Sequence, residues 1–283
     1  MWFKFEKCQE THRQSEQLLA TIARPDRDGS ALERIRQLIG DGVDLNRMHG
    51  NLLPLQSACV GGDAAIVKLL IAYGASVNEP DGYGRSALHY AAERCVRCVA
   101  VLLAAGASVS ARDRHGNTPL HWAAYKDQRA CVRMLLDAGA HVDATDDSGD
   151  TALSWAALKG HLYVMRALLE HNCRTDTCNV SGGSALSRLV STIAMGIGST
   201  VEDDCLRLLL NFTAQLRLGD ELRRLVRGHE QLAELLLPLA DRPQRLQQLC
   251  RCAVRAAMGA GPLRPRVRTL PLAPPLMLYL DAV

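Results

Sequence analysis

Aromatic residues, net charge and lysine are all scarce in this chain of 283 residues. Only 4% of the residues are aromatic, the formal net charge is +3, and no run of basic residues is interleaved with aromatics. These three observations argue against a nucleic-acid partner. Lysine occurs only at positions 4, 7, 68, 126 and 159, so arginine supplies nearly all of the positive charge.

Long apolar runs are also missing. No stretch approaches the ~20 apolar residues that span a bilayer, and the first ten residues, MWFKFEKCQE, lack the apolar core of a signal peptide. Several of the ten cysteines occupy helix positions that a core would use: Cys59, Cys98, Cys131, Cys205 and Cys250. Free buried thiols in a reducing compartment explain them best. We therefore expect a soluble, cytoplasmic protein with no membrane partner.

No set of residues indicates catalysis or a cofactor. Cys95 and Cys98 form a lone CxxC without two further ligands at zinc-finger spacing. His89 and His121 have no carboxylate or nucleophile paired with them by sequence, so a structural role between neighbouring repeats is favoured. We find no acid–base pair and no metal cluster, and predict that the chain is not an enzyme and holds neither a metal nor a cofactor.

The middle of the chain is a repeat. Similar segments, among them SALHYAA, TPLHWAA and TALSWAA, recur around leucines spaced by 33, 32, 33 and 33 residues. These leucines are Leu55, Leu88, Leu120, Leu153 and Leu186. In the third copy, Thr118 and Pro119 can open one helix, and Gly139 can end a second. The period and the TPLHWAA and VxxLLxxGA patterns resemble the ankyrin repeat, which implies an all-α solenoid stabilised by stacking of neighbouring copies.

Three segments follow from this pattern. We expect a lead-in over residues 1–29, mobile or partly helical, and an ankyrin-repeat domain with degenerate end repeats over 30–240. A separate C-terminal segment should occupy 241–283.

Two surfaces of the repeats could bind a partner protein. Tyr90, Trp122 and Trp155 occupy one equivalent position, which favours packing between repeats but could also form a binding stripe. The turn tips vary more, with Tyr83 and Arg114 among their residues, and the mixed charges there indicate a protein-binding surface. All five residues are candidate substrate contacts.

The last segment combines an apolar-striped helix with a proline-rich apolar tail. The stripe consists of apolar residues three and four positions apart: Leu246, Leu249, Cys250, Ala253, Val254 and Ala257. The tail, TLPLAPPLMLYLDAV, carries more apolar surface than so short a segment can bury. We expect another polypeptide to cover it.

This segment resembles the SOCS box, and the whole layout resembles the ankyrin repeat and SOCS box family. The resemblance implies a three-helix box that recruits elongin B, elongin C and a cullin of the cullin-5 type with its RING protein. Leu246, Cys250 and Val254 match the elongin-binding pattern. Leu270, Pro271 and Leu272 match the cullin-binding motif.

Two positions depart from the family pattern. Arg245 stands where a small residue or proline is usual, and Ala273 replaces the second proline of the cullin motif. Cullin binding is therefore the weaker of the two inferences.

The function that this resemblance implies is substrate recognition for a ubiquitin ligase, with an unidentified protein held by the repeats. The alternative is an ankyrin scaffold whose C-terminal helix only caps the stack. The absence of lysine after Lys159 would limit self-ubiquitination, but a general bias towards arginine is the slightly favoured explanation.

Overall fold

The computed structural model describes residues 2–23, 30–197, 200–213, 220–241, 257 and 259. These residues are helical apart from loops and two isolated bridges, His49 with Leu52 and Thr145 with Thr151. The predicted all-α fold is confirmed for this part of the chain. The chain divides into two compact units, Met1–Ala140 and His141–Val283.

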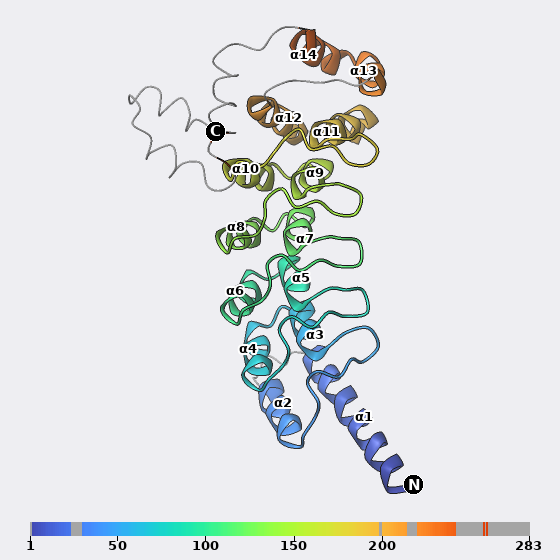
Figure 1. Cartoon of the computed structure of the whole chain (residues 1–283), viewed down its shortest axis with the longest axis vertical. Helices are drawn as coiled ribbons and strands as arrows, with labels where there is room; N and C mark the ends of the chain where they lie inside the picture. Colours follow the sequence, from blue (N-terminus) through green and yellow to red (C-terminus); the bar gives the residue numbers. More distant parts are fainter. Residues whose placement is uncertain are drawn as a thin grey trace, which may run out of the picture. The chain divides into compact units, whose positions relative to one another are not determined.

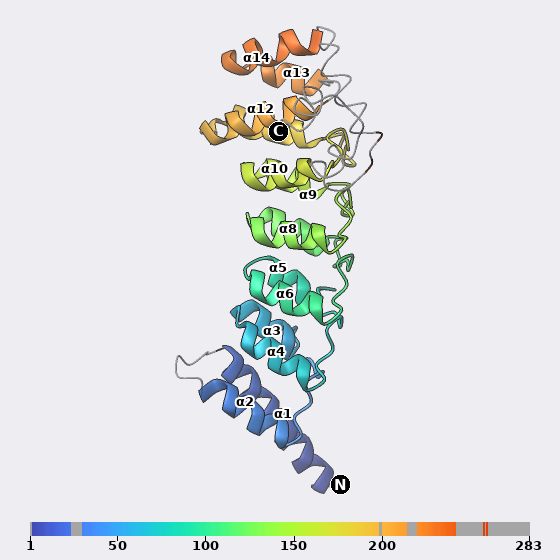
Figure 2. The ribbon, with the colours of Figure 1, turned by 90° about the vertical axis from the view of Figure 1, so that its left-hand side faces the viewer.

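The first unit is built from helix pairs. Its helices are α1 (Trp2–Ala23), α2 (Ser30–Gly40), α3 (Pro54–Gly61), α4 (Ala64–Ala72), α5 (Ala87–Ala92), α6 (Val96–Ala104), α7 (Pro119–Tyr125) and α8 (Arg129–Asp137). The inner helices α3, α5 and α7 pack on one another, and α4, α6 and α8 form a second row behind them (Figure 1). Figure 2 shows the pairs α3–α4 and α5–α6 as successive layers.

Each pair closes because one helix brings small residues to the other. Leu88, Ala91 and Ala92 of α5 are fully buried, and Val99 and Leu102 of α6 are buried against them. Alanine has no side chain beyond Cβ, so the two helices can approach closely. This confirms that the repeated leucines and alanines form the core.

The helix ends follow the chemistry expected from the sequence. Pro119 lies in the first turn of α7, after Thr118 as N-cap. The side chain of Asp63 accepts hydrogen bonds from the first turn of α4. Gly106 follows α6 with φ of 81°, a conformation that costs glycine little.

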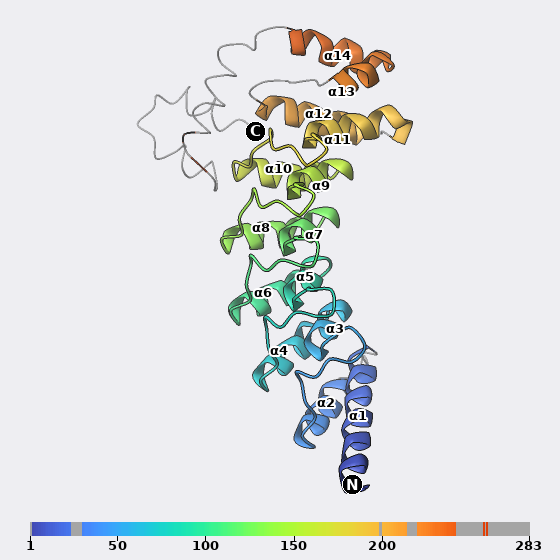
Figure 3. The ribbon, with the colours of Figure 1, turned by 45° about the vertical axis from the view of Figure 1, so that its right-hand side comes forward.

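The segment expected as a lead-in contains a long helix, α1. It contacts α2 and α3 (Figure 3), and Leu18 and Ile22 on it are almost completely buried. Because α1 buries apolar side chains against its neighbours, it packs as part of the repeat stack.

The second unit continues the helix-pair pattern with longer and less regular elements. Its helices are α9 (Ala152–Leu158), α10 (Leu162–Glu170), α11 (Ala185–Thr192), the π-helical turn η1 (Ile193–Ile197), α12 (Thr200–Phe212), α13 (Asp220–Arg227) and α14 (Glu230–Asp241). Helix α9 packs on α10 and α11, α11 on α12 and α13, and α13 on α14. The segment from residue 242, where we expect the three-helix box, lies outside the described residues except for Ala257 and Gly259.

Candidate functional site

Hairpin loops precede the inner helices and extend away from the outer row (Figure 1). In each of the loops that precede α5, α7 and α9, here the second, third and fourth loops, an aspartate accepts backbone hydrogen bonds from the same loop. In the second loop, Asp81 Oδ1 accepts hydrogen bonds from the backbone N–H groups of Tyr83 (2.7 Å) and Arg85 (2.8 Å). Asp113 and Asp146 make the same two bonds in their own loops.

Although they lie in the hairpin loops, these aspartates are not exposed recognition residues. Asp81, Asp113 and Asp146 are at most 8% exposed. For Asp113, burial alone would raise the pKa, but hydrogen bonds from His115, Asn117 and Trp122 outweigh it and lower the pKa below its ordinary value. The ionised carboxylate thus organises the loop from within.

The three aromatic residues at the equivalent helix position each bind the aspartate of their own loop. The distances to Oδ2 are 2.5 Å from Tyr90 Oη to Asp81, 3.1 Å from Trp122 Nε1 to Asp113, and 3.1 Å from Trp155 Nε1 to Asp146. All three rings are half-buried. This geometry supports the packing interpretation, although each of the three residues keeps part of its surface exposed.

Arg85, which the sequence reasoning missed, lies between two of these rings. Its guanidinium is 3.9 Å from the centroid of Trp122 and 5.6 Å from that of Tyr90. Such cation–π contacts contribute about 0.5–2 kcal/mol. Glu93 and Asp113 lie 3.6 and 3.7 Å from its nitrogens. One feature of the sequence could have identified Arg85. It stands just before the inner helix, at a position where the next two copies carry Asn117 and Asp150.

Tyr83 and Arg114 lie on adjacent turn tips. The N–H of Arg114 donates to the carbonyl of Tyr83 at 3.0 Å, Tyr83 is 55% exposed, and Arg114 is exposed as well. Gly84 permits this approach, because a Cβ there would lie 2.9 Å from Arg114 N and φ is +76°. Four of the five predicted contact residues, Tyr83, Tyr90, Arg114 and Trp122, thus lie in the first unit. Trp155 belongs to the second.

The histidines serve the structure, as predicted. His89 Nδ1 accepts the N–H of Ser86, and Nε2 lies 3.0 Å from the carbonyl of Asn117 in the next copy. Burial is the main cause that lowers the pKa of His89, so the neutral ring with its proton on Nε2 is favoured. His121 Nδ1 accepts the N–H of Thr118 in the same way.

The CxxC pair is also occupied by local bonds. Cys95 Sγ donates to the carbonyl of Gly62 at 3.3 Å and accepts the N–H of Cys98 at 3.4 Å. Burial raises the pKa of Cys98 to about 12, which makes it a poor nucleophile. Among the described residues, no group of three or more His, Cys, Asp and Glu side chains is arranged to hold a metal.

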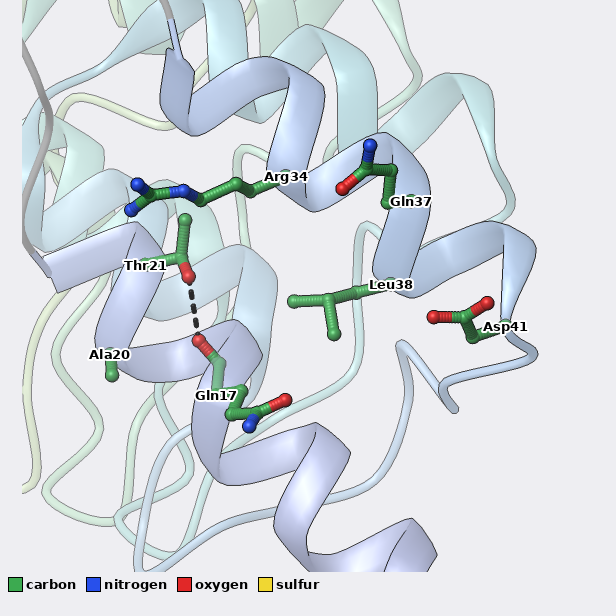
Figure 4. Close-up of a pocket in the computed structure, with 7 residues that line it drawn as sticks. All are labelled: Gln17, Ala20, Thr21, Arg34, Gln37, Leu38 and Asp41. Atoms are coloured by element: carbon green, nitrogen blue, oxygen red, sulfur yellow. Dashed lines mark hydrogen bonds between the residues drawn. The ribbon is translucent and has the colours of Figure 1, made fainter.

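An open depression of about 500 Å³ lies between α1 and α2 (Figure 4). Its lining residues are Gln17, Ala20, Thr21, Arg34, Gln37, Leu38 and Asp41. The hydroxyl of Thr21 donates to the carbonyl of Gln17 on the same helix. This lining contains no nucleophile paired with a base.

The residues predicted to bind elongin and cullin lie outside the described part of the chain: Leu246, Cys250, Val254, Leu270, Pro271 and Leu272. Gly259 of that region is described: Asn172 Nδ2 donates to its carbonyl at 2.7 Å. No helix in the described ranges is both long and apolar enough to cross a membrane.

Known protein families match both the repeats and the C-terminal segment. Ankyrin-repeat families match residues 22–113, 102–156 and 148–180, and the SOCS box family matches residues 242–281. The chain is 42% identical over 96 residues to ankyrin repeat and SOCS box protein 8 of Homo sapiens and 43% identical to that of Mus musculus. A putative ankyrin repeat protein of Pyrobaculum aerophilum is 39% identical over 86 residues, 30% of each chain.

The match to the two mammalian proteins covers 33% of this chain and 33% of each relative. It therefore spans about a third of the relatives' length. Together the matches confirm the resemblance that the repeat and the tail indicated. The chain is an ankyrin-repeat protein with a SOCS box after its repeats, the domain organisation of the ankyrin repeat and SOCS box proteins.

Proposed function

We propose that this chain is the substrate-recognition subunit of an elongin B/C–cullin–RING ubiquitin ligase in the cytoplasm. The observation that carries the proposal is the SOCS box match at 242–281, which follows the ankyrin-repeat matches that end at residue 180. Both modules are non-catalytic adaptors. The chain would act by proximity, because holding a target lysine near a charged conjugating enzyme raises its effective concentration.

The elongin contact rests on one helix face. Leu246, Cys250 and Val254 are four residues apart, so a helix would present them as a single stripe to a groove. A thiol at Cys250 suits a position where a longer side chain would not fit. Arg245 would lie at the rim of such a groove.

The cullin contact rests on Leu270, Pro271 and Leu272. Ala273 follows where a second proline is usual, and alanine restricts the backbone less than proline does. We therefore propose a weaker hold on the cullin-5 type scaffold and its RING protein than on elongin B and elongin C.

A double variant, Leu246→Ala with Cys250→Ala, tests the elongin contact. Loss of a buried anchor of this kind costs about 2 kcal/mol or more, so affinity for purified elongin B/C should fall at least about thirtyfold. Leu235→Ala on α14 is the matched control, because that leucine is 40% exposed and lies outside the SOCS box. Unchanged elongin binding in the double variant would refute the proposal.

The scaffold alternative has one observation in its favour, the hydrogen bond between Asn172 and Gly259. It joins the SOCS-box region to the repeats of the same unit, as a cap would. If the C-terminal helix only caps the stack, the double variant should lower the melting temperature of the repeats. In that case neither the parent protein nor the double variant should bind elongin B/C.

A further inference from the structure

In the hairpin loops before α5 and α7 the aspartate carboxylates are buried, and the loop before α7 exposes basic side chains. The carboxylates of Asp81 and Asp113 are buried and accept hydrogen bonds from their own loops. Arg114 and His115, in the loop that precedes α7, are exposed. At the position equivalent to Arg114, the next loop carries Asp147, so the positive tip is specific to the first unit.

Arg85 adds a positive group that is held in place before any ligand arrives. Its guanidinium stacks on Trp122, and its side chain is only 23% exposed. The carboxylates of Glu93 and Asp113, at 3.6 and 3.7 Å, are farther away than hydrogen-bond partners. They form ion pairs with the guanidinium and offset its charge, but neither carboxylate is within hydrogen-bond distance of its N–H groups.

These groups form one surface, here called the arginine surface: Tyr83, Arg85, Tyr90, Arg114 and Trp122. Adjacent tips are joined by the bond from Arg114 N–H to the carbonyl of Tyr83. The surface therefore combines two arginines with an exposed tyrosine and two half-buried rings. An arginine that is held on an aromatic ring, with no carboxylate of its own chain within hydrogen-bond distance, is suited to bidentate binding of an added carboxylate.

We propose that the arginine surface binds an extended acidic segment of the target protein, with Asp or Glu side chains on Arg85 and Arg114. This inference rests on the proposed function, in which the repeats hold the substrate. Carboxylate is favoured over phosphate because Glu93 and Asp113 stand beside Arg85 and would repel a dianion more strongly than a monoanion. The exposed ring of Tyr83 gives the segment an apolar contact at the tip.

The test uses the full chain, incubated with elongin B/C, and a displayed library of random 12-residue peptides. We expect the selected peptides to be enriched in Asp and Glu. A synthetic copy of a selected peptide should lose affinity when its acidic residues become Asn or Gln. Arg85→Gln should weaken binding about tenfold to a hundredfold, since a charge-assisted hydrogen bond is lost.

Two further variants separate recognition from folding. Arg85→Lys keeps the charge but not the fork and should bind with intermediate affinity, whereas Arg114→Asp copies the next loop at an exposed position and should abolish binding. Arg97→Gln on α6 is the matched control, because it removes one exposed arginine from the outer row and should leave affinity unchanged.

Selection of no peptide, selection of peptides without acidic enrichment, or tighter binding of a synthetic phosphoserine peptide than of its glutamate counterpart would overturn the inference. So would an equal loss of affinity in Arg97→Gln. Elongin binding is measured in the same samples. If it persists while acidic selection fails, only this inference falls; if it is absent, the proposed function falls and the peptide result stands separately.

Discussion

The third and fifth repeats fix their hairpin loops with different side chains. In the third repeat, Asp113 holds the loop and accepts a hydrogen bond from Trp122. In the fifth, Asn179 holds the loop, and Arg188 stands at the position of Trp122. Arg188 turns instead to Asp150 of the preceding loop, with Nε 2.9 Å from Oδ1 and a second, very short contact from Nη2 to Oδ2.

The backbone positions that these side chains serve are the same in both repeats. The N–H of Thr118 is capped by His121 at 3.1 Å, and the N–H of Ser184 by Ser187 at 2.7 Å. The fold thus requires a capped helix N-terminus and a polar contact, here called the link, between the inner helix and a hairpin loop. Different side chains can provide both of these interactions. Because the link can vary, the surface that it leaves exposed can differ between repeats.

The largest expected effect comes from breaking the link of the fifth repeat. Asp150→Ala leaves the half-buried guanidinium of Arg188 without its carboxylate, whose side chain is 3% exposed. We expect a loss of about 3 kcal/mol in the free energy of unfolding, measured by urea denaturation. The triple variant Asp150→Asn, Asn179→Asp and Arg188→Trp transplants the link of the third repeat and should recover most of this loss. Failure to recover any would show that the two links are not interchangeable.

Asp113→Asn gives the third repeat the loop residue of the fifth. We expect a loss of about 2 kcal/mol at pH 7, since the charged acceptor of Trp122 and of the loop N–H groups disappears. The folded-state pKa of Asp113 is lowered, so its contribution is complete above the unfolded pKa of about 3.9 and is lost as pH falls through the folded pKa. The parent and variant should therefore become equally stable in strong acid. A difference that persists there would contradict the electrostatic origin.

His89→Gln copies the first repeat, where Gln56 caps Leu53 and donates to the carbonyls of Glu79 and Arg85. Burial keeps the pKa of His89 below 6.5. The unfolded state therefore binds the extra proton first, and stability falls as pH drops below about 6.5. The variant should lose this part of the slope, which for one proton is at most about 1.4 kcal/mol per pH unit. An unchanged slope between pH 7 and 5 would assign it to other groups.

The smallest effect is expected at Asn78. Its amide donates to the carbonyl of Gly106 and accepts the N–H of Ser108, whereas Asp143 in the second unit only accepts, from Arg174 N–H. Asn78→Asp converts the first arrangement into the second and removes one exposed hydrogen bond. We expect a loss of about 0.5 kcal/mol, measured as above. A loss of several kcal/mol would mean that these links differ in more than one bond.

Much of the fold could be predicted, because the repeated leucines and the helix caps act locally. Leu88 and Leu120 are buried as their spacing predicted, and Thr118 and Pro119 begin α7 as expected. The packing of α1 could not be predicted, since residues 2–23 carry no copy of the repeat pattern. The elongin and cullin residues remain predictions, because they lie outside the described residues.

The candidate surface was predicted only in part. Tyr83 and Arg114 were chosen as variable tip residues and do lie on adjacent tips. Asp81 and Asp146 also lie in hairpin loops but are buried within them. A turn sequence does not reveal whether a carboxylate faces outward or bonds to its own backbone, because both conformations use the same residues.

The sequence by itself determined the repeat, its register, the helix ends and the resemblance to a SOCS box, since all of these depend on residues close together along the chain. Only the tertiary structure decided that Arg85 lies on Trp122, that His89 bonds to Asn117, and that the loop aspartates are buried. The first two contacts join neighbouring repeats, and their geometry is set by how closely the inner helices stack. Stacking distance depends on the packing of many small side chains at once, which no local pattern specifies.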